Sequence, residues 1–100
     1  MIEKETMHAD AFQIRQAVPA DVKLILQFIQ KLGAYEKLSH EVVATEEKLH
    51  KTLFEQRMAE VIIGEYQGAP VGFALFFHNY STFLGQAGIY LEDLFVDPEM

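Results

Sequence analysis

The sequence predicts one small α/β domain of the α+β type, in the order strand, helix, helix, strand, strand, strand, with a largely antiparallel sheet. In its first half, apolar residues recur at the three- and four-residue spacing of helices, and in its second half β-branched and aromatic runs alternate with turn residues. A length of 100 residues excludes two domains, and 50% hydrophobic residues exclude a disordered chain.

The first half begins with residues 1–11, which are polar and aperiodic, so we expect a disordered leader before a domain spanning residues 12–100. Residues 12–18 alternate as a short strand does. Pro19 suits the first position of a helix, and Asp21 places negative charge in its first turn. The expected buried stripe is Val22, Ile25, Leu26, Ile29 and Leu32, with Gly33 as the stop.

A loop over residues 35–44 separates this helix from a second one, which we expect to begin at Thr45. Its predicted buried side is Leu49, Leu53, Phe54 and Met58. Residues 60–66 and 71–79 are rich in β-formers and flank the turn residues 67–70, which predicts a hairpin. We expect a longer connection over residues 80–88 and a last strand over residues 89–96, closed by Asp97-Pro98.

The last strand is unusual because each face would hold one carboxylate among large apolar residues. Simple alternation places Glu92 with Tyr90, Leu94 and Val96, and Asp93 with Ile89, Leu91 and Phe95. In a structural interpretation, the two carboxylates lie where the sheet frays or pair with a distant Lys or Arg. In a functional interpretation, a cleft lets water and a cationic substrate reach them. Periodicity does not decide between these interpretations.

The charge and cysteine content narrow the class of protein. Eight basic and fifteen acidic residues give a net charge of −7, with no basic stripe, so nucleic acid is not an expected partner. No run approaches the roughly 18 apolar residues of a membrane span. The absence of cysteine fits a reducing, cytoplasmic location. The histidines lie too far apart for a metal site, and we expect none; they are His8, His40, His50 and His78.

Three segments resemble the GNAT acetyltransferase superfamily, and within it the diamine (spermidine/spermine-type) N-acetyltransferases. They are VGFALFF at residues 71–77, YSTFLG at 80–85 and, above all, YLEDLFV at 90–96. The resemblance covers residues 12–100 and corresponds to the N-terminal half of the GNAT fold. It implies an enzyme that transfers acetyl from acetyl-CoA to a primary amine.

The resemblance also implies roles for the last strand. Acetyl transfer needs a neutral amine, and Glu92 matches the family's general base, acting directly or through a water. GNAT proteins stabilise the thioester oxygen with a backbone N–H at a bulge in this strand, which would break the simple alternation. Leu94, Phe95 and Val96 match positions whose main chain pairs with the pantetheine amides of acetyl-CoA.

The same resemblance implies an acceptor groove of carboxylates and aromatic surface, suited to a small cationic amine. Tyr35, Glu36, Phe83 and Asp93 match positions in that lining. Phe83 replaces a larger aromatic residue, and Thr82 lies near an expected acidic one, so a shorter diamine or a lysine-like amino acid is as plausible as a polyamine. For Tyr35 and Phe83, packing under a loop is an equal alternative.

The family's pyrophosphate loop and its thiolate-protonating tyrosine would lie beyond Met100. Without that loop we expect these residues alone to bind acetyl-CoA weakly or not at all, and to be inactive. The bare edge and apolar face of residues 89–96 predict a homodimer, or a partner chain that supplies the missing half. The alternative to an enzyme is a truncated, non-catalytic GNAT-like binding module.

Overall fold

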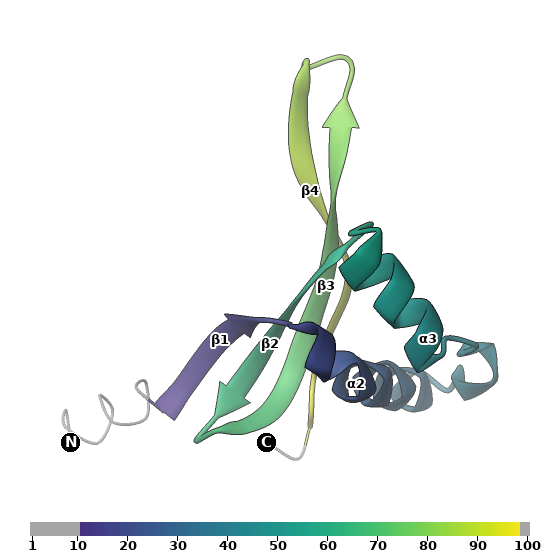
Figure 1. Cartoon of the computed structure of the whole chain (residues 1–100), viewed down its shortest axis with the longest axis vertical. Coiled ribbons are helices and arrows are strands. Elements are labelled where there is room, and N and C mark those ends of the chain that lie inside the picture. The colour runs from purple at the N-terminus through teal and green to yellow at the C-terminus, as the bar shows by residue number, and fades with distance from the viewer. Residues whose placement is uncertain (1–10, 99–100) are drawn as a thin grey trace.

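The computed structural model describes residues 11–98, and the expected leader lies outside them except for Ala11. The fold is α+β, as predicted: a four-stranded antiparallel sheet in the order β1-β2-β3-β4 carries its helices on one face (Figure 1). The strands are β1 (Phe12–Gln16), β2 (Glu60–Tyr66), β3 (Ala69–Ser81) and β4 (Gln86–Val96). The helices are α2 (Val22–Tyr35) and α3 (Glu46–Leu49), with the short turns η1 (Pro19–Asp21) and η2 (Ser39–Glu41) and the π-helical segment η3 (His50–Glu55).

The first helix begins as the sequence predicts. Val18 is extended, Pro19 opens the turn η1, and α2 follows without interruption. Val22 and Ile25 of the predicted stripe are buried. Phe28, which the stripe omitted, is buried as well, because it lies three residues after Ile25 on the same side of the helix.

The predicted stop at Gly33 is wrong, because α2 continues to Tyr35. The left-handed residue that ends the helix is Lys37, with φ of 61°. Gly33 is buried instead, and a Cβ there would lie 2.7 Å from a methyl group of Val42. This glycine therefore serves a close contact between α2 and the following loop.

The second helix also begins where expected, since the Thr45 Oγ1 accepts a hydrogen bond of 3.1 Å from the N–H of Lys48. Leu49 and Leu53 are buried, as predicted. Met58 is not part of that side: it is 68% exposed, because the helix ends at Glu55 and the backbone turns away.

The core lies between the helices and the sheet. The ring of Phe28 stacks on Phe73 of β3 with centroids 5.6 Å apart, and its centroid lies 6.1 Å from that of Phe95 of β4. Ile25 and Ile63 are fully buried beside them. Burying each such side chain contributes on the order of 2 kcal/mol, so this cluster secures the helices to β2, β3 and β4.

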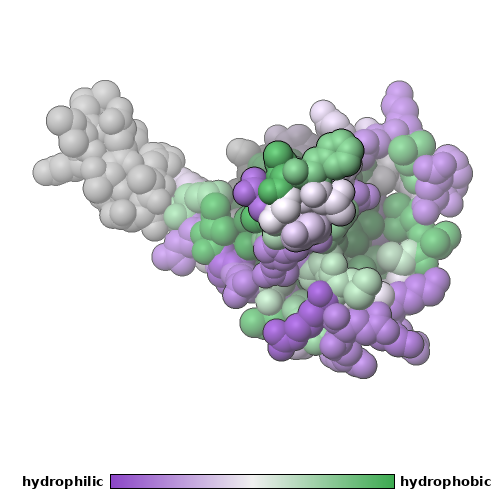
Figure 2. Space-filling view, turned by 90° about the horizontal axis from the view of Figure 1, so that it is seen from above, coloured by the Kyte–Doolittle hydropathy of each residue, from purple (hydrophilic) through white to green (hydrophobic). Residues whose placement is uncertain are grey.

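The two hairpins differ in length. Gln67 and Gly68 both have positive φ and close the β2–β3 hairpin tightly, as the turn residues predict. The predicted long connection over residues 80–88 is wrong, since β3 and β4 stay paired as far as Ser81 and Gln86. The paired strands form an arm that extends away from the helices (Figure 1). Apolar surface covers its end (Figure 2), where Phe83 and Leu84 are exposed.

No helix between residues 11 and 98 is long and apolar enough to cross a membrane.

Candidate active site

A β-bulge interrupts β4 at the two carboxylates. Leu75 pairs with Asp93, but the next residue of β3, Phe76, pairs with Leu91, so Glu92 is an extra residue with no partner opposite. The bulge implied by the resemblance is therefore present, and it breaks the simple alternation of this strand. Tyr90 now lies on the same face as Asp93, where its ring stacks on that of Phe77 with centroids 5.0 Å apart.

The bulge separates the environments of the two carboxylates. Glu92 is exposed, whereas Asp93 is half-buried on the helix side of the sheet. Burial raises the pKa of Asp93 above its ordinary value, and the charges of Glu92 and Glu36 raise it further. The structure thus brings together three of the predicted site residues, although Glu36 comes from the end of α2.

The carboxylates of β4 do not belong to a fraying end or a distant ion pair. Both lie inside β4, and the ion pairs among residues 11–98 include neither Glu92 nor Asp93. Asp93 is half-buried near Glu92 and Glu36, and no cationic side chain pairs with it among residues 11–98. Such a group of carboxylates favours the binding of an added cation. A cleft at these carboxylates stays a prediction, since neither Glu92 nor Asp93 lines the two cavities described below.

A cavity of about 370 Å³ lies between the end of α2 and the end of β4. Tyr35 and Phe95 supply its aromatic lining, and Lys31 and Asp97 form an ion pair there with Nζ and Oδ2 3.3 Å apart. Tyr35 is 71% exposed, so it is not packed under a loop. Lys31 and Asp97 were not identified from the sequence, and no local signal joins residues 66 positions apart.

Phe83 is the predicted site residue that the structure places elsewhere. It is 100% exposed at the end of the arm, about 20 Å or more along β4 from Asp93. Within one chain it neither packs under a loop nor joins the carboxylates.

The outer edge of β4 faces no other strand among the described residues. The N–H of Asp97 donates to the carbonyl of Val71 at 2.8 Å, so the main chain of Asp97 is directed toward β3. Alternation along an antiparallel strand then directs the main chain of Leu94 and Val96 to the open edge, and that of Phe95 to β3. The side chain of Phe95 is buried in the core.

A four-stranded antiparallel sheet with helices on one face and a bulged, carboxylate-bearing edge strand is a GNAT-like fold, and this chain is related to acetyltransferases of that superfamily. Within the superfamily, it is related to the thialysine N-epsilon-acetyltransferases of the diamine acetyltransferase type. A scan against known protein families finds no match.

Among curated proteins, thialysine N-epsilon-acetyltransferase of Bos taurus is 41% identical over 95 residues, which are 86% of this chain and 55% of the relative. The enzyme of the same name from Caenorhabditis elegans is 33% identical, covering 88% and 54%. L-ornithine N5-acetyltransferase of Arabidopsis thaliana is 28% identical, covering 91% and 60%. The chain therefore spans a little more than half the length of the curated relatives it matches.

Among solved structures, an aminoglycoside acetyltransferase from an uncultured soil metagenomic sample, in complex with sisomicin, superposes with a TM-score of 0.73. The two chains are 20% identical, and the match covers 91% of this chain and 59% of that one. A ribosomal-protein-alanine N-acetyltransferase from Brucella melitensis has a TM-score of 0.68 at 16% identity, covering 89% and 59%. At these identities the likeness shows the fold alone.

Proposed function

We propose that this chain provides the catalytic strand and part of the amine site of an N-acetyltransferase that uses acetyl-CoA and a small cationic primary amine. The observation that supports this most is the bulge at Glu92, beside the half-buried Asp93 on an open strand edge. Relatives named for acetyl transfer to thialysine and to ornithine support it further. A cytoplasmic location stays a prediction from the sequence.

The proposed reaction begins with removal of a proton from the bound ammonium by Glu92, directly or through a water. The neutral nitrogen then attacks the thioester carbonyl and bonds to the acetyl carbon, and the carbon–sulfur bond breaks. The nitrogen loses its second proton to solvent to leave the neutral amide, and the released thiolate takes up one proton from solvent. Glu92 suits the role of base because its carboxylate is exposed and reaches solvent. The bulge leaves a main-chain N–H outside the regular ladder, where it could stabilise the oxyanion.

Asp93 and Glu36 are assigned to hold the cationic end of the amine. A cation placed between them would offset the repulsion and burial that raise the pKa of Asp93. Tyr35 adds an exposed aromatic face on the cavity at the end of α2, suited to contact with an alkylammonium. We favour an amino acid with a side-chain amine over a polyamine, because the relatives are named for two such acceptors, thialysine and ornithine.

The proposal for acetyl-CoA is that Leu94 and Val96 pair with the pantetheine amides through the open edge of β4, with Phe95 holding the strand to the core.

Glu92→Gln tests the catalytic proposal, with acetyl transfer to lysine, ornithine and putrescine measured on a chain of the relatives' full length. We expect turnover at neutral pH to fall by about 10²–10⁴ while acetyl-CoA affinity is unchanged. Asp93→Asn should instead raise KM for the amine. Full turnover by the Glu92→Gln variant would refute the assignment of the base, and no transfer by the full-length wild type would favour the binding module.

A binding module is the second candidate, and the open edge of β4 is the observation that favours it. Ile89, Leu91, Leu94 and Val96 are exposed along this strand, and an apolar strand edge pairs readily with another chain. We propose that two copies associate through β4, and light scattering should report a dimer. Leu94→Lys should shift it to monomer; a concentration-independent monomer in the wild type would refute this association.

A further inference from the structure

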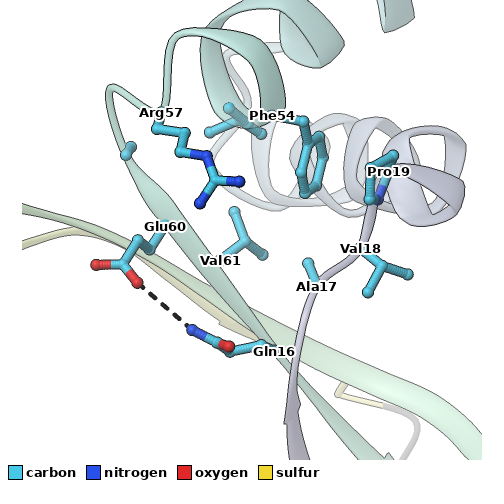
Figure 3. Close-up of a pocket in the computed structure, with 10 residues that line it drawn as sticks. Gln16, Ala17, Val18, Pro19, Phe54, Arg57, Glu60 and Val61 are labelled. Atoms are coloured by element: carbon cyan, nitrogen blue, oxygen red, sulfur yellow. Dashed lines mark hydrogen bonds between the residues drawn. The ribbon is translucent and has the colours of Figure 1, made fainter.

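A second cavity, of about 440 Å³, lies where β1 passes into η1 and where η3 leads into β2. None of its lining residues belongs to the candidate active site. Figure 3 shows Phe54, Val61, Ala17 and Pro19 around it, with the guanidinium of Arg57 extending between them. Its volume falls within the 300–1,000 Å³ usual for small-molecule sites.

Arg57 differs from Arg15 and Lys31, which both form ion pairs with carboxylates. No carboxylate among residues 11–98 lies within ion-pair distance of Arg57. Its backbone has a positive φ of 53° and lies between two hydrogen bonds that close the helix end. The N–H of Gln56 donates to the carbonyl of Lys51, and the N–H of Met58 donates to that of Thr52. The guanidinium is thus presented to the cavity from a closed helix end.

Glu60 also lines the cavity, and its carboxylate is paired with Gln16, which lines the cavity too, and with His78. It accepts from the Nε2 of Gln16 at 3.5 Å (Figure 3) and lies 2.8 Å from the Nε2 of His78. Glu60 pairs with Phe76 and Val61 with Leu75, so Glu60 and Val61 belong to opposite faces of the sheet. The positive charge of Arg57 therefore has no built-in counterion beside the apolar walls.

We propose that this cavity binds a small amphipathic carboxylate. The planar guanidinium donates two parallel hydrogen bonds to a carboxylate, which a single cation can neutralise, and apolar walls suit a hydrophobic body. Phe54 and Val61 would contact that body, and Pro19 would close its far side. The site is independent of the acetyl-transfer proposal, because the two share no residue.

The test uses phenylacetate as the probe and phenylacetamide, which has the same shape without the charge, as its comparison. Binding to the full chain is followed by the amide NMR shifts of Val61 and Phe54 and by the methyl shifts of Val61. We expect phenylacetate to bind about tenfold more tightly than phenylacetamide, and Arg57→Gln to remove that difference. Lys51→Gln, which removes an exposed charge from the same helix, should leave the affinity unchanged.

Three results would overturn the proposal: equal affinity of phenylacetate for the wild type and Arg57→Gln, shifts that map outside the cavity, or no shift at millimolar probe. Arg57→Lys keeps the charge and loses the planar fork, so it should bind phenylacetate with intermediate affinity. The amide spectrum of each variant shows whether it is folded.

Discussion

Asp21 joins β1 to α2, and its removal should destabilise the whole fold. Its two carboxylate oxygens accept hydrogen bonds of 2.7 and 2.8 Å from the Arg15 guanidinium, and one of them also accepts from the N–H of Val18 at 2.8 Å. Asp21 is only 8% exposed. The sequence suggested a favourable charge in the first helical turn; the structure adds a buried ion pair between consecutive elements.

The expected loss follows from these contacts. A hydrogen bond to a charged group contributes about 1.5–3 kcal/mol when it is well shielded. Arg15 is 36% exposed and keeps Glu65 as a second partner at 3.1 Å, so water and Glu65 offset part of the loss. We expect Asp21→Ala to lower the free energy of unfolding by about 2–3 kcal/mol. Asp21→Asn should lose about half of that, because its amide oxygen still accepts from Val18.

Urea unfolding followed by circular dichroism measures both variants, with Glu41→Gln on the exposed turn η2 as the matched control. The control should stay within about 0.5 kcal/mol of the wild type. The hydrogen bonds from Arg15 hold the pKa of Asp21 below its ordinary value of 3.8. The stabilisation is therefore present above that value and is lost as the pH falls below it, so the variants should converge with the wild type in acid. Equal stability at neutral pH, or a difference unchanged at about pH 3, would refute the reasoning.

Two further substitutions test the strand pairing and the carboxylate cluster. Gly72→Ala should destabilise the fold by about 1–3 kcal/mol, because a Cβ there would overlap the main-chain oxygen of Phe95. Gly64→Ala meets only the ring tip of Phe12 at 3.3 Å and is the control; equal losses in urea unfolding would contradict the close approach of β3 and β4. Asp93→Asn should stabilise the chain slightly at neutral pH, by less than about 1 kcal/mol after solvent screening. The raised pKa of Asp93 means that its ionised form is disfavoured in the fold, so the gain in stability should disappear as the pH falls through that pKa. A loss of stability in Asp93→Asn at neutral pH would instead show that Asp93 has a stabilising partner.

The candidate site shows how far sequence reasoning reaches. Glu92 and Asp93 were identified from the last strand, and Tyr35 and Glu36 from the resemblance. The structure places Glu36 close enough to Asp93 to raise the pKa of that carboxyl. Phe83 was grouped with them, yet it lies at the end of the arm. A motif identifies residue types, but the length of the β3–β4 pairing decides how far apart they lie.

The sequence by itself determined the element order, the start of both helices at Pro19 and Thr45, the tight β2–β3 turn and the relationship to acetyltransferases. These features depend on neighbouring residues, through helical spacing, capping and turn chemistry. The resemblance implied a bulge in the last strand, but only the tertiary structure decided that it falls at Glu92, how long the arm is, and that a cavity lies beside Arg57. Each of these results from pairing or packing between separate segments, whose register no local pattern specifies.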